Sequence, residues 1–298
     1  MKVLVTGGEG FIGRNIIDLC RLKGWETISL DIAQGESKAD IKIIGSVLDL
    51  PLLRKITKDV DYVFHEAAMT SPPQFEERPA EGFEINTEGT LRVLQASKEC
   101  GVRRVVLASS SAIYGNAMNV TKESDKIPNF INHYPLTKHL NELTAKFYTD
   151  NFQLDTVCLR YFNTYGKGEN SKGFYSSVIH KFIGAIRNKE SPVIFGDGSQ
   201  SRDFIYVKDT ARANILAAEK GKGNAVYNVG TGVTTSFNDI FRLVNELMEV
   251  NVAPSYEPIP FKTYQMFTRA DISRIKTDLS FEPEYDLRKG IEEMVETR

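Results

Sequence analysis

The chain has 298 residues, of which 41% are hydrophobic and 26% are charged, and its formal net charge is −2. This is the composition of a globular protein with a large core. The balanced charge excludes the basic surface typical of nucleic-acid binding, and no apolar run reaches the roughly 18 residues that a membrane span needs. Three isolated cysteines, Cys20, Cys100 and Cys158, and the lack of a secretory signal predict a reduced, cytoplasmic protein with neither nucleic-acid nor membrane partners.

Short apolar runs alternate with helix-length segments through the first half of the chain. The apolar runs lie at 2–6, 27–31, 61–65, 104–109 and 156–162, and the helical segments at 11–23, 49–58, 83–100 and 134–151. Continuous runs rich in Val and Ile are typical of strands buried on both faces of a parallel sheet. The alternation predicts an α/β fold with a doubly wound parallel sheet. Further helices are predicted at 174–188, 208–219 and 236–249, between glycine-rich loops.

The first predicted strand leads into the segment VLVTGGEGFIG at 3–13. Here Gly7 permits a tight turn, Gly10 lets the backbone approach a pyrophosphate, and Gly13 lets the helix pack closely on the strand. Asp31 ends the next strand, where a carboxylate can accept hydrogen bonds from both ribose hydroxyls and repel a 2′-phosphate. The pattern predicts a dinucleotide site that prefers NAD to NADP. The alternative is a plain strand–turn–helix with a solvated aspartate.

Two later segments carry hydroxyl groups and a lysine. SSSAIYG begins at Ser109, at the predicted carboxyl end of a strand, where open α/β sheets bind ligands. In YPLTK, Tyr134 and Lys138 are spaced to share one face of a helix. A lysine ammonium and a positive nicotinamide ring favour the phenolate, so Tyr134 could remove a proton from an alcohol that a serine orients. The alternative is a solvated serine turn beside an ordinary helix.

With these motifs the chain resembles the nucleotide-sugar epimerase/dehydratase branch of the extended short-chain dehydrogenase/reductase family. Eight segments follow the family's order over nearly the whole chain: TGGEGFIG, HEAA, INTEGTLRVLQAS, SSSAIYG, YPLTK, LRYFNTYG, FGDGSQSRDFIYVKD and YNVGTG. The resemblance implies an NAD-binding Rossmann domain at 1–162, to which segments near 203–230 return, and a smaller, interleaved substrate lobe made mostly of 163–298. It also implies a homodimer in which 86–100 and 135–150 pair across a two-fold axis.

The resemblance assigns roles by position. It makes Tyr134 the acid/base, Lys138 the residue that binds the nicotinamide ribose and lowers the pKa of the tyrosine, and Ser110 the catalytic hydroxyl. The positions that it implies contact NAD are Gly7, Gly10, Phe11, Ile12, Gly13, Asp31, Ser46, Val47, Ala67, Asn86, Tyr134, Lys138 and Phe162. The positions that it implies contact the nucleotide sugar are Ser111, Asn163 and Arg202 at the sugar and diphosphate, and Phe195 at the uracil.

The chain also departs from the family pattern. Ser46 and Val47 replace an Asp-apolar pair near the adenine, Lys262 and Arg269 are both candidates for a second phosphate contact, and Thr268 falls near the C2 substituent of the sugar. The four histidines, at 65, 133, 139 and 180, show no ligand spacing, so no metal site is expected.

The residues before the YG motif discriminate between reactions. Family members that eliminate water or release carbon dioxide carry acids there, where this chain has Ser111 and Ala112. The resemblance therefore favours a 4-epimerase that acts on UDP-galactose and UDP-glucose, or on N-acetylated forms, through a transient 4-keto sugar. The alternatives are a UDP-glucuronate epimerase or decarboxylase, a dehydratase, a net NAD-dependent dehydrogenase or reductase, and a non-catalytic NAD sensor, which would be expected to lack Tyr134 or Lys138.

Overall fold

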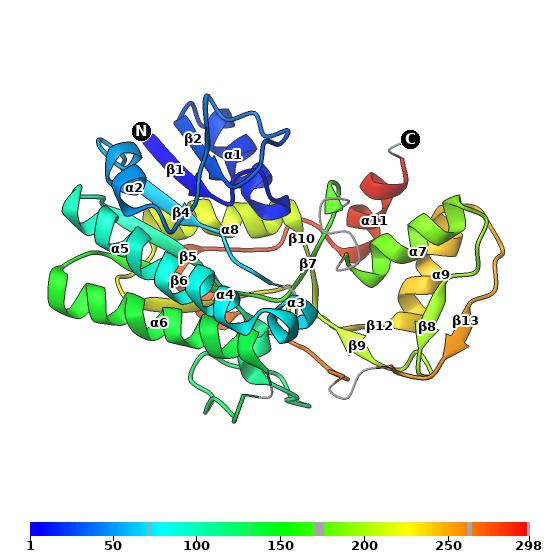
Figure 1. Ribbon diagram of the computed structural model, residues 1–298. Helices are drawn as coiled ribbons and strands as arrows, with labels where there is room; N and C mark the ends of the chain where they lie inside the picture. Colours follow the sequence, from blue (N-terminus) through cyan, green and yellow to red (C-terminus); the bar gives the residue numbers. More distant parts are fainter. Residues whose placement is uncertain (71, 131, 170–175, 261–263, 297–298) are drawn as a thin grey trace.

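A computed structural model describes residues 1–70, 72–130, 132–169, 176–260 and 264–296 (Figure 1). Its main element is a seven-stranded parallel sheet of β1 (Lys2–Thr6), β2 (Glu26–Asp31), β3 (Ile41–Ile44), β4 (Tyr62–His65), β5 (Arg104–Ser110), β6 (Thr156–Tyr161) and β11 (Ala225–Val229). The strand order is β3-β2-β1-β4-β5-β6-β11. The reversal of strand order next to β1 is that of a doubly wound fold, so the predicted fold class is confirmed.

Helices cover both faces of this sheet. On one face lie α1 (Phe11–Leu22), α8 (Val207–Lys220) and α10 (Ser273–Leu279), and on the other lie α2 (Leu50–Ile56), α5 (Gly89–Glu99) and α6 (His133–Phe152). Each face has its own apolar core, because strands such as β1 and β5 alternate buried apolar side chains between the two sides. None of the helices among the described residues is long and apolar enough to cross a membrane.

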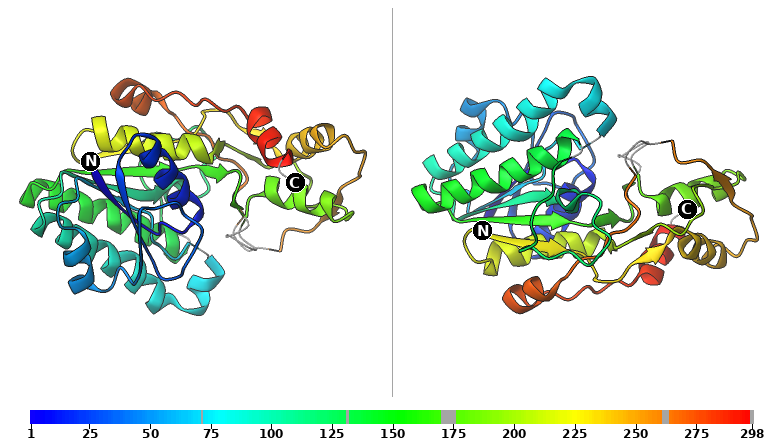
Figure 2. Two further views of the ribbon diagram at one scale, coloured as in Figure 1. Left: turned by 90° about the horizontal axis from the view of Figure 1, so that it is seen from above. Right: turned by 90° about the horizontal axis from the view of Figure 1, so that it is seen from below.

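A smaller group of elements lies to one side of the sheet (Figures 1 and 2). The helices α7 (Val178–Arg187), α9 (Phe237–Leu247) and α11 (Leu287–Val295) share a separate apolar core. Three strand pairs accompany them: β7 (Asn163–Tyr165) with β10 (Phe204–Tyr206), β9 (Ser201–Arg202) with β12 (Thr235–Ser236), and β8 (Val193–Phe195) with β13 (Ser255–Glu257). β7 begins two residues after β6 ends, so the chain passes directly from the sheet into this group.

The structure differs from the predicted elements in several places. Residues 83–100 are not one α-helix, because α4 (Pro79–Phe83) continues through the π-helix η1 (Glu84–Glu88) into α5. β3 was not predicted, since it is an edge strand with mostly exposed side chains and therefore has no buried apolar pattern. β11 was not predicted either, because Asn228 interrupts its apolar run; the buried amide is satisfied by the Tyr114 hydroxyl, which donates to it at 2.6 Å. A short helix, α3 (Pro72–Glu77), precedes α4.

Candidate active site

The glycine loop joins β1 to α1 in a conformation that only glycine tolerates at two positions. Gly7 has φ +66°, and a Cβ there would lie 2.8 Å from the Ala67 nitrogen. A Cβ on Gly13 would lie 2.2 Å from the Gly7 carbonyl oxygen, so α1 could not approach the loop. Gly10 is the N-cap of α1 and offers no side-chain cap to the first helical N–H groups. The buried Phe11 and half-buried Ile12 form the first turn, so this helix start can hold a pyrophosphate.

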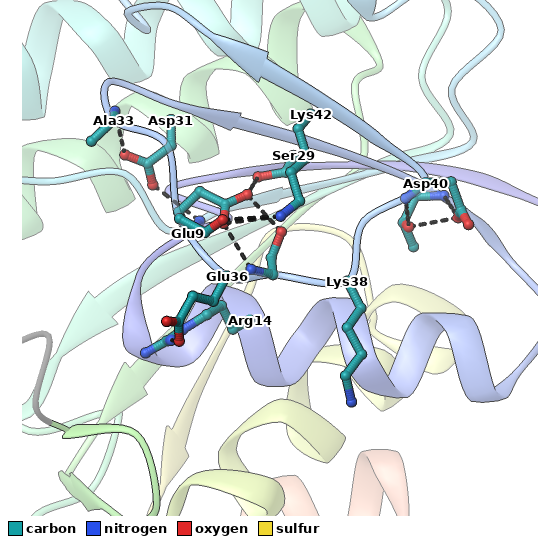
Figure 3. Close-up of polar contacts among 12 residues, drawn as sticks. Glu9, Arg14, Ser29, Asp31, Ala33, Glu36, Lys38, Asp40 and Lys42 are labelled. Carbon is teal, nitrogen blue, oxygen red and sulfur yellow. Dashed lines mark hydrogen bonds and ion pairs between the residues drawn. The ribbon is translucent and has the colours of Figure 1, made fainter.

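Asp31 lies at the carboxyl end of β2, beside the glycine loop (Figure 3). Its carboxylate accepts a hydrogen bond from the Glu9 backbone nitrogen at 3.1 Å and a longer one from the Ala33 nitrogen at 3.4 Å. Asp31 pairs with Ile44 at the end of β3, which places the following residues, Ser46 and Val47, on the same side of the sheet edge. The predicted ribose and adenine contacts therefore lie close together.

The segment after β4 joins the glycine loop to α6. Ala67 borders Gly7, and the next residues are held by Asn86, whose amide accepts from the Met69 nitrogen at 2.7 Å and donates to the Met69 oxygen at 2.9 Å. The same amide donates to the Thr137 hydroxyl at 3.1 Å. Asn86 thus ties this segment to α6, the helix that carries Tyr134 and Lys138.

Ser110, Tyr134 and Lys138 come together from two elements. Ser110 ends β5 and caps the 3-10 helix η2 (Ser111–Tyr114), and its hydroxyl lies close enough to the Tyr134 side chain to favour the phenolate. Lys138 is buried; its Nζ donates to the Ala108 carbonyl at 2.9 Å and lies 5.9 Å from the centre of the Tyr134 ring. The serine turn and the helix therefore form a single site, in which a hydroxyl, a phenol and an ammonium group can act together.

Burial dominates the protonation of this site. It raises the pKa of Tyr134 to about 12, with the help of the nearby Glu66 carboxylate, whereas the neighbouring Ser110 side chain lowers the pKa. Burial also lowers the pKa of Lys138 below its usual value, while the Glu66 carboxylate opposes this effect. Tyr134 is thus a neutral phenol at neutral pH within the protein's own field, and a further positive charge beside it would lower its pKa.

Glu66 is a residue of this site that sequence reasoning missed. Its Oε1 accepts from the Tyr161 hydroxyl at 2.7 Å, and that hydroxyl accepts from the Asn214 amide at 2.8 Å. Burial raises the pKa of Glu66, although Tyr161 and the Lys138 charge lower it. The signal in the sequence was an acid placed directly after the apolar strand β4.

His65, which ends the same strand, has a structural role. Its ring nitrogens lie 2.8 Å from the Thr6 hydroxyl and 2.9 Å from the Thr90 hydroxyl. Burial lowers the pKa of His65 to about 3, and the Lys138 charge lowers it further, so the ring is neutral in the folded protein at ordinary pH.

A pocket of about 280 Å³ lies where β7, β9 and the start of α7 meet, and both Asn163 and Arg202 line it. Arg202 is buried, and its guanidinium lies 5.6 Å from the Phe237 ring centre and 5.7 Å from the Tyr264 ring centre. No carboxylate among the described residues pairs with Arg202, and burial lowers its pKa to about 10. A buried cation without an acidic partner at a pocket wall is suited to bind an anion.

The other predicted substrate residues do not all lie at this pocket. Ser111 and Phe162 line a smaller pocket with Thr268, whose hydroxyl accepts from the Asn163 amide at 2.9 Å. Phe195, at the end of β8, lines neither pocket, and its carbonyl accepts from the Gln200 amide at 2.6 Å. Arg269 is exposed and donates to the Gly232 carbonyl at 2.7 Å, while Lys262 lies outside the described residues.

Comparison with known proteins agrees with this geometry. Residues 3–230 match the model of a family described as the NAD dependent epimerase/dehydratase family. A UDP-N-acetylglucosamine 4-epimerase from Methanobrevibacter ruminantium M1, in complex with UDP-N-acetylmuramic acid, is 35% identical, with a TM-score of 0.92 over 100% of this chain and 99% of that chain.

Two further solved structures are similar over nearly their whole length. The UDP-glucose 4-epimerase from Thermotoga maritima, with UDP-glucose, is 33% identical, with a TM-score of 0.93 over 99% of this chain and 98% of that chain. MoeE5, in complex with UDP-glucose and NAD, is 32% identical, with a TM-score of 0.91 over the same shares of the two chains.

Proposed function

The chain belongs to the NAD dependent epimerase/dehydratase family, and we propose that it inverts C4 of a UDP-hexose through a transient 4-keto sugar. Its cofactor is NAD, and its substrates are nucleotide sugars. UDP-galactose and UDP-glucose, or their N-acetylated forms, are the substrates that we propose.

One observation carries this choice of reaction. Ser110, Tyr134 and Lys138 form a complete set for proton transfer, whereas Ser111 and Ala112 stand where an acid would be needed to act on the keto sugar. Such a group next to the keto intermediate accelerates both the elimination of water and the loss of carbon dioxide. Without it, the return of hydride to the other face of the keto sugar is the step that we propose.

The roles of the residues follow from their contacts. Tyr134 would take the proton of the C4 hydroxyl, and Ser110, whose side chain lies beside that phenol, would orient the hydroxyl. Lys138 is held beneath the tyrosine ring by the Ala108 carbonyl, where its charge can stabilise the phenolate. NAD, when bound, supplies the acceptor that takes hydride from C4 and returns it. Arg202 would hold the diphosphate, so the ketone can rotate while the nucleotide stays in place.

We assign cofactor binding to residues 1–162, with the returning segment near 203–230, and substrate binding mostly to 163–298. The glycine loop would bind the pyrophosphate through the start of α1, and Asp31 would bind the ribose hydroxyls. The separate apolar cores support the division, since two of them flank the large sheet and a third lies among α7, α9 and α11.

We also propose that the protein is a homodimer and that it acts in the cytoplasm. Leu143 and Phe147 on α6 are 51% and 53% exposed, and Leu91 on the neighbouring α5 is 37% exposed. Apolar side chains at this exposure on two adjacent helices suit a helix-bundle interface. A Leu143→Glu/Phe147→Glu variant should elute as a monomer, as measured by light scattering. All three cysteines are free thiols, which suits a reducing compartment.

The test is a panel of UDP-sugars without added cofactor. Purified protein is incubated with UDP-glucose, UDP-galactose, their N-acetyl forms and UDP-glucuronate, and the products are resolved by chromatography and mass spectrometry. We expect a C4 epimer of equal mass and no accumulation of NADH. Stoichiometric NADH would indicate a dehydrogenase, loss of water a dehydratase, and release of carbon dioxide a decarboxylase. Any of these three results would contradict the proposal.

A further inference from the structure

Glu9, inside the glycine loop, is an unexpected charge at the ribose end of the cofactor site. Its backbone nitrogen donates to the Asp31 carboxylate at 3.1 Å, and its side chain is only 7% exposed (Figure 3). The carboxylate accepts from the Ser29 hydroxyl at 2.7 Å, the Ser37 hydroxyl at 2.6 Å and the Ser37 nitrogen at 2.8 Å. Burial raises the pKa of Glu9, but these hydrogen bonds and Lys42 bring it below its usual value, so Glu9 is ionised at neutral pH.

Lys42 is the cation that Glu9 holds. It lies on β3 opposite Ser29, so both side chains point to the same face of the sheet. Its Nζ lies 3.9 Å from a Glu9 carboxylate oxygen and donates to the Gly35 carbonyl at 3.0 Å. Figure 3 shows Glu9 between Asp31 and Lys42. A basic residue therefore stands near Asp31 in space although none follows it closely in the chain, and Glu9 neutralises it.

The segment that follows Asp31 packs on the Glu9 carboxylate. A Cβ on Gly35 would lie 2.7 Å from the Glu9 side chain, and Ser37 binds it twice. Further along the segment, Asp40 accepts from the Thr27 hydroxyl at 2.7 Å, and at the surface Arg14 lies 3.6 Å from Glu36, whose side chain is 92% exposed. Glu9 is thus a buried anchor of the segment that borders the ribose site.

We propose that Glu9 is a second determinant of the choice of NAD over NADP, acting with Asp31. A 2′-phosphate on a ribose held at Asp31 would lie next to the glycine-loop residue that hydrogen-bonds the Asp31 carboxylate, which is Glu9. There it would meet a buried negative charge, and Lys42, the cation that could bind it, is already engaged. Replacing Asp31 alone therefore leaves NADP excluded. The inference rests on NAD binding and is independent of which sugar is the substrate.

The experiment measures nucleotide binding without any sugar. Glu9→Gln, Asp31→Ser, the double variant and the double variant with Lys42→Met are each equilibrated with equimolar NAD and NADP. After desalting, bound nucleotides are released with acid and quantified, and dissociation constants are measured by calorimetry. The glutamine oxygen can still accept from the Ser29 and Ser37 hydroxyls, which both donate to one Glu9 oxygen, but the glutamine amide cannot also accept from the Ser37 nitrogen. Circular dichroism therefore checks that each variant is folded. Glu36→Gln in the Asp31→Ser background is the matched control, because it removes an exposed carboxylate from the same segment.

We expect Asp31→Ser to weaken NAD binding with little gain in NADP. Adding Glu9→Gln should raise the ratio of bound NADP to NAD by a further factor of about ten or more, the scale of one charged hydrogen bond. Lys42→Met should cancel that gain, and Glu36→Gln should not reproduce it. The inference is overturned if Asp31→Ser alone matches the double variant, if the gain survives Lys42→Met, or if the folded double variant loses both nucleotides equally. A negative result in the UDP-sugar panel would leave this measurement unaffected.

Discussion

Replacing Arg202 with methionine should stabilise the fold while it weakens UDP binding. Arg202 is 7% exposed and has no carboxylate partner among the described residues, and burial lowers its pKa to about 10. Because the folded pKa lies below the unfolded one, folding disfavours the charged form by about 3 kcal/mol at any pH below the folded pKa. This cost fades only as the pH rises above about 10, towards the pKa of the unfolded chain.

The contacts of Arg202 offset part of this cost. Its guanidinium lies over the rings of Phe237 and Tyr264 and donates to the Ser201 carbonyl at 3.0 Å. Two cation–π contacts and one hydrogen bond are together worth about 2 kcal/mol. A methionine keeps apolar contact with both rings. We therefore expect the free energy of unfolding of the Arg202→Met variant to rise by about 1 kcal/mol.

Binding should change in the opposite direction. If Arg202 holds the diphosphate through charged hydrogen bonds, its loss should weaken UDP binding by about a hundredfold. Urea unfolding followed by circular dichroism measures stability, and calorimetry with UDP measures binding. Added UDP should raise the melting temperature of the wild type and leave that of the variant unchanged. Arg202→Lys is the control that keeps the charge and should not gain stability. A methionine variant that is less stable than the wild type and still binds UDP would refute the reasoning.

Three further predictions follow from buried groups. Tyr134→Phe should fold and bind NAD normally but lower kcat by about a hundredfold, measured by epimer formation. His65 has a folded pKa of about 3, so the unfolded chain takes up its proton first as the pH falls. The free energy of unfolding of the wild type should therefore fall by about 2 kcal/mol between pH 7 and pH 5 because of His65. Urea unfolding of the His65→Gln variant should lack this part of the pH dependence. Glu142 is buried 2.8 Å from Arg160, so Glu142→Gln should lower the free energy of unfolding by about 3 kcal/mol or more, measured the same way. A wild-type kcat in Tyr134→Phe, a wild-type pH dependence of stability in His65→Gln, or a wild-type free energy of unfolding in Glu142→Gln would contradict the respective prediction.

The features that the sequence determined by itself are those set by neighbouring residues. The strand and helix periodicity of the first half, the turn at Gly7 and the i, i+4 spacing of Tyr134 and Lys138 all depend on local backbone geometry. Such geometry can be read from a short window of sequence. The parallel sheet and the glycine loop were therefore predicted from the sequence. β3 and β11 were missed, because one lacks a buried side and the other contains an asparagine whose partner, Tyr114, lies far away in the chain.

The partners of the buried charges were decided only by the tertiary structure. The proximity of Ser110 to Tyr134 depends on how α6 packs against the end of β5. The pairing of Lys42 with Glu9 depends on the register of β2 with β3. The contacts of Arg202 with two aromatic rings, and the position of Phe195 outside both pockets, likewise depend on how distant segments meet. A side chain's residue type is local, but its burial and its electrostatic field are sums over atoms that lie near it only after the chain has folded.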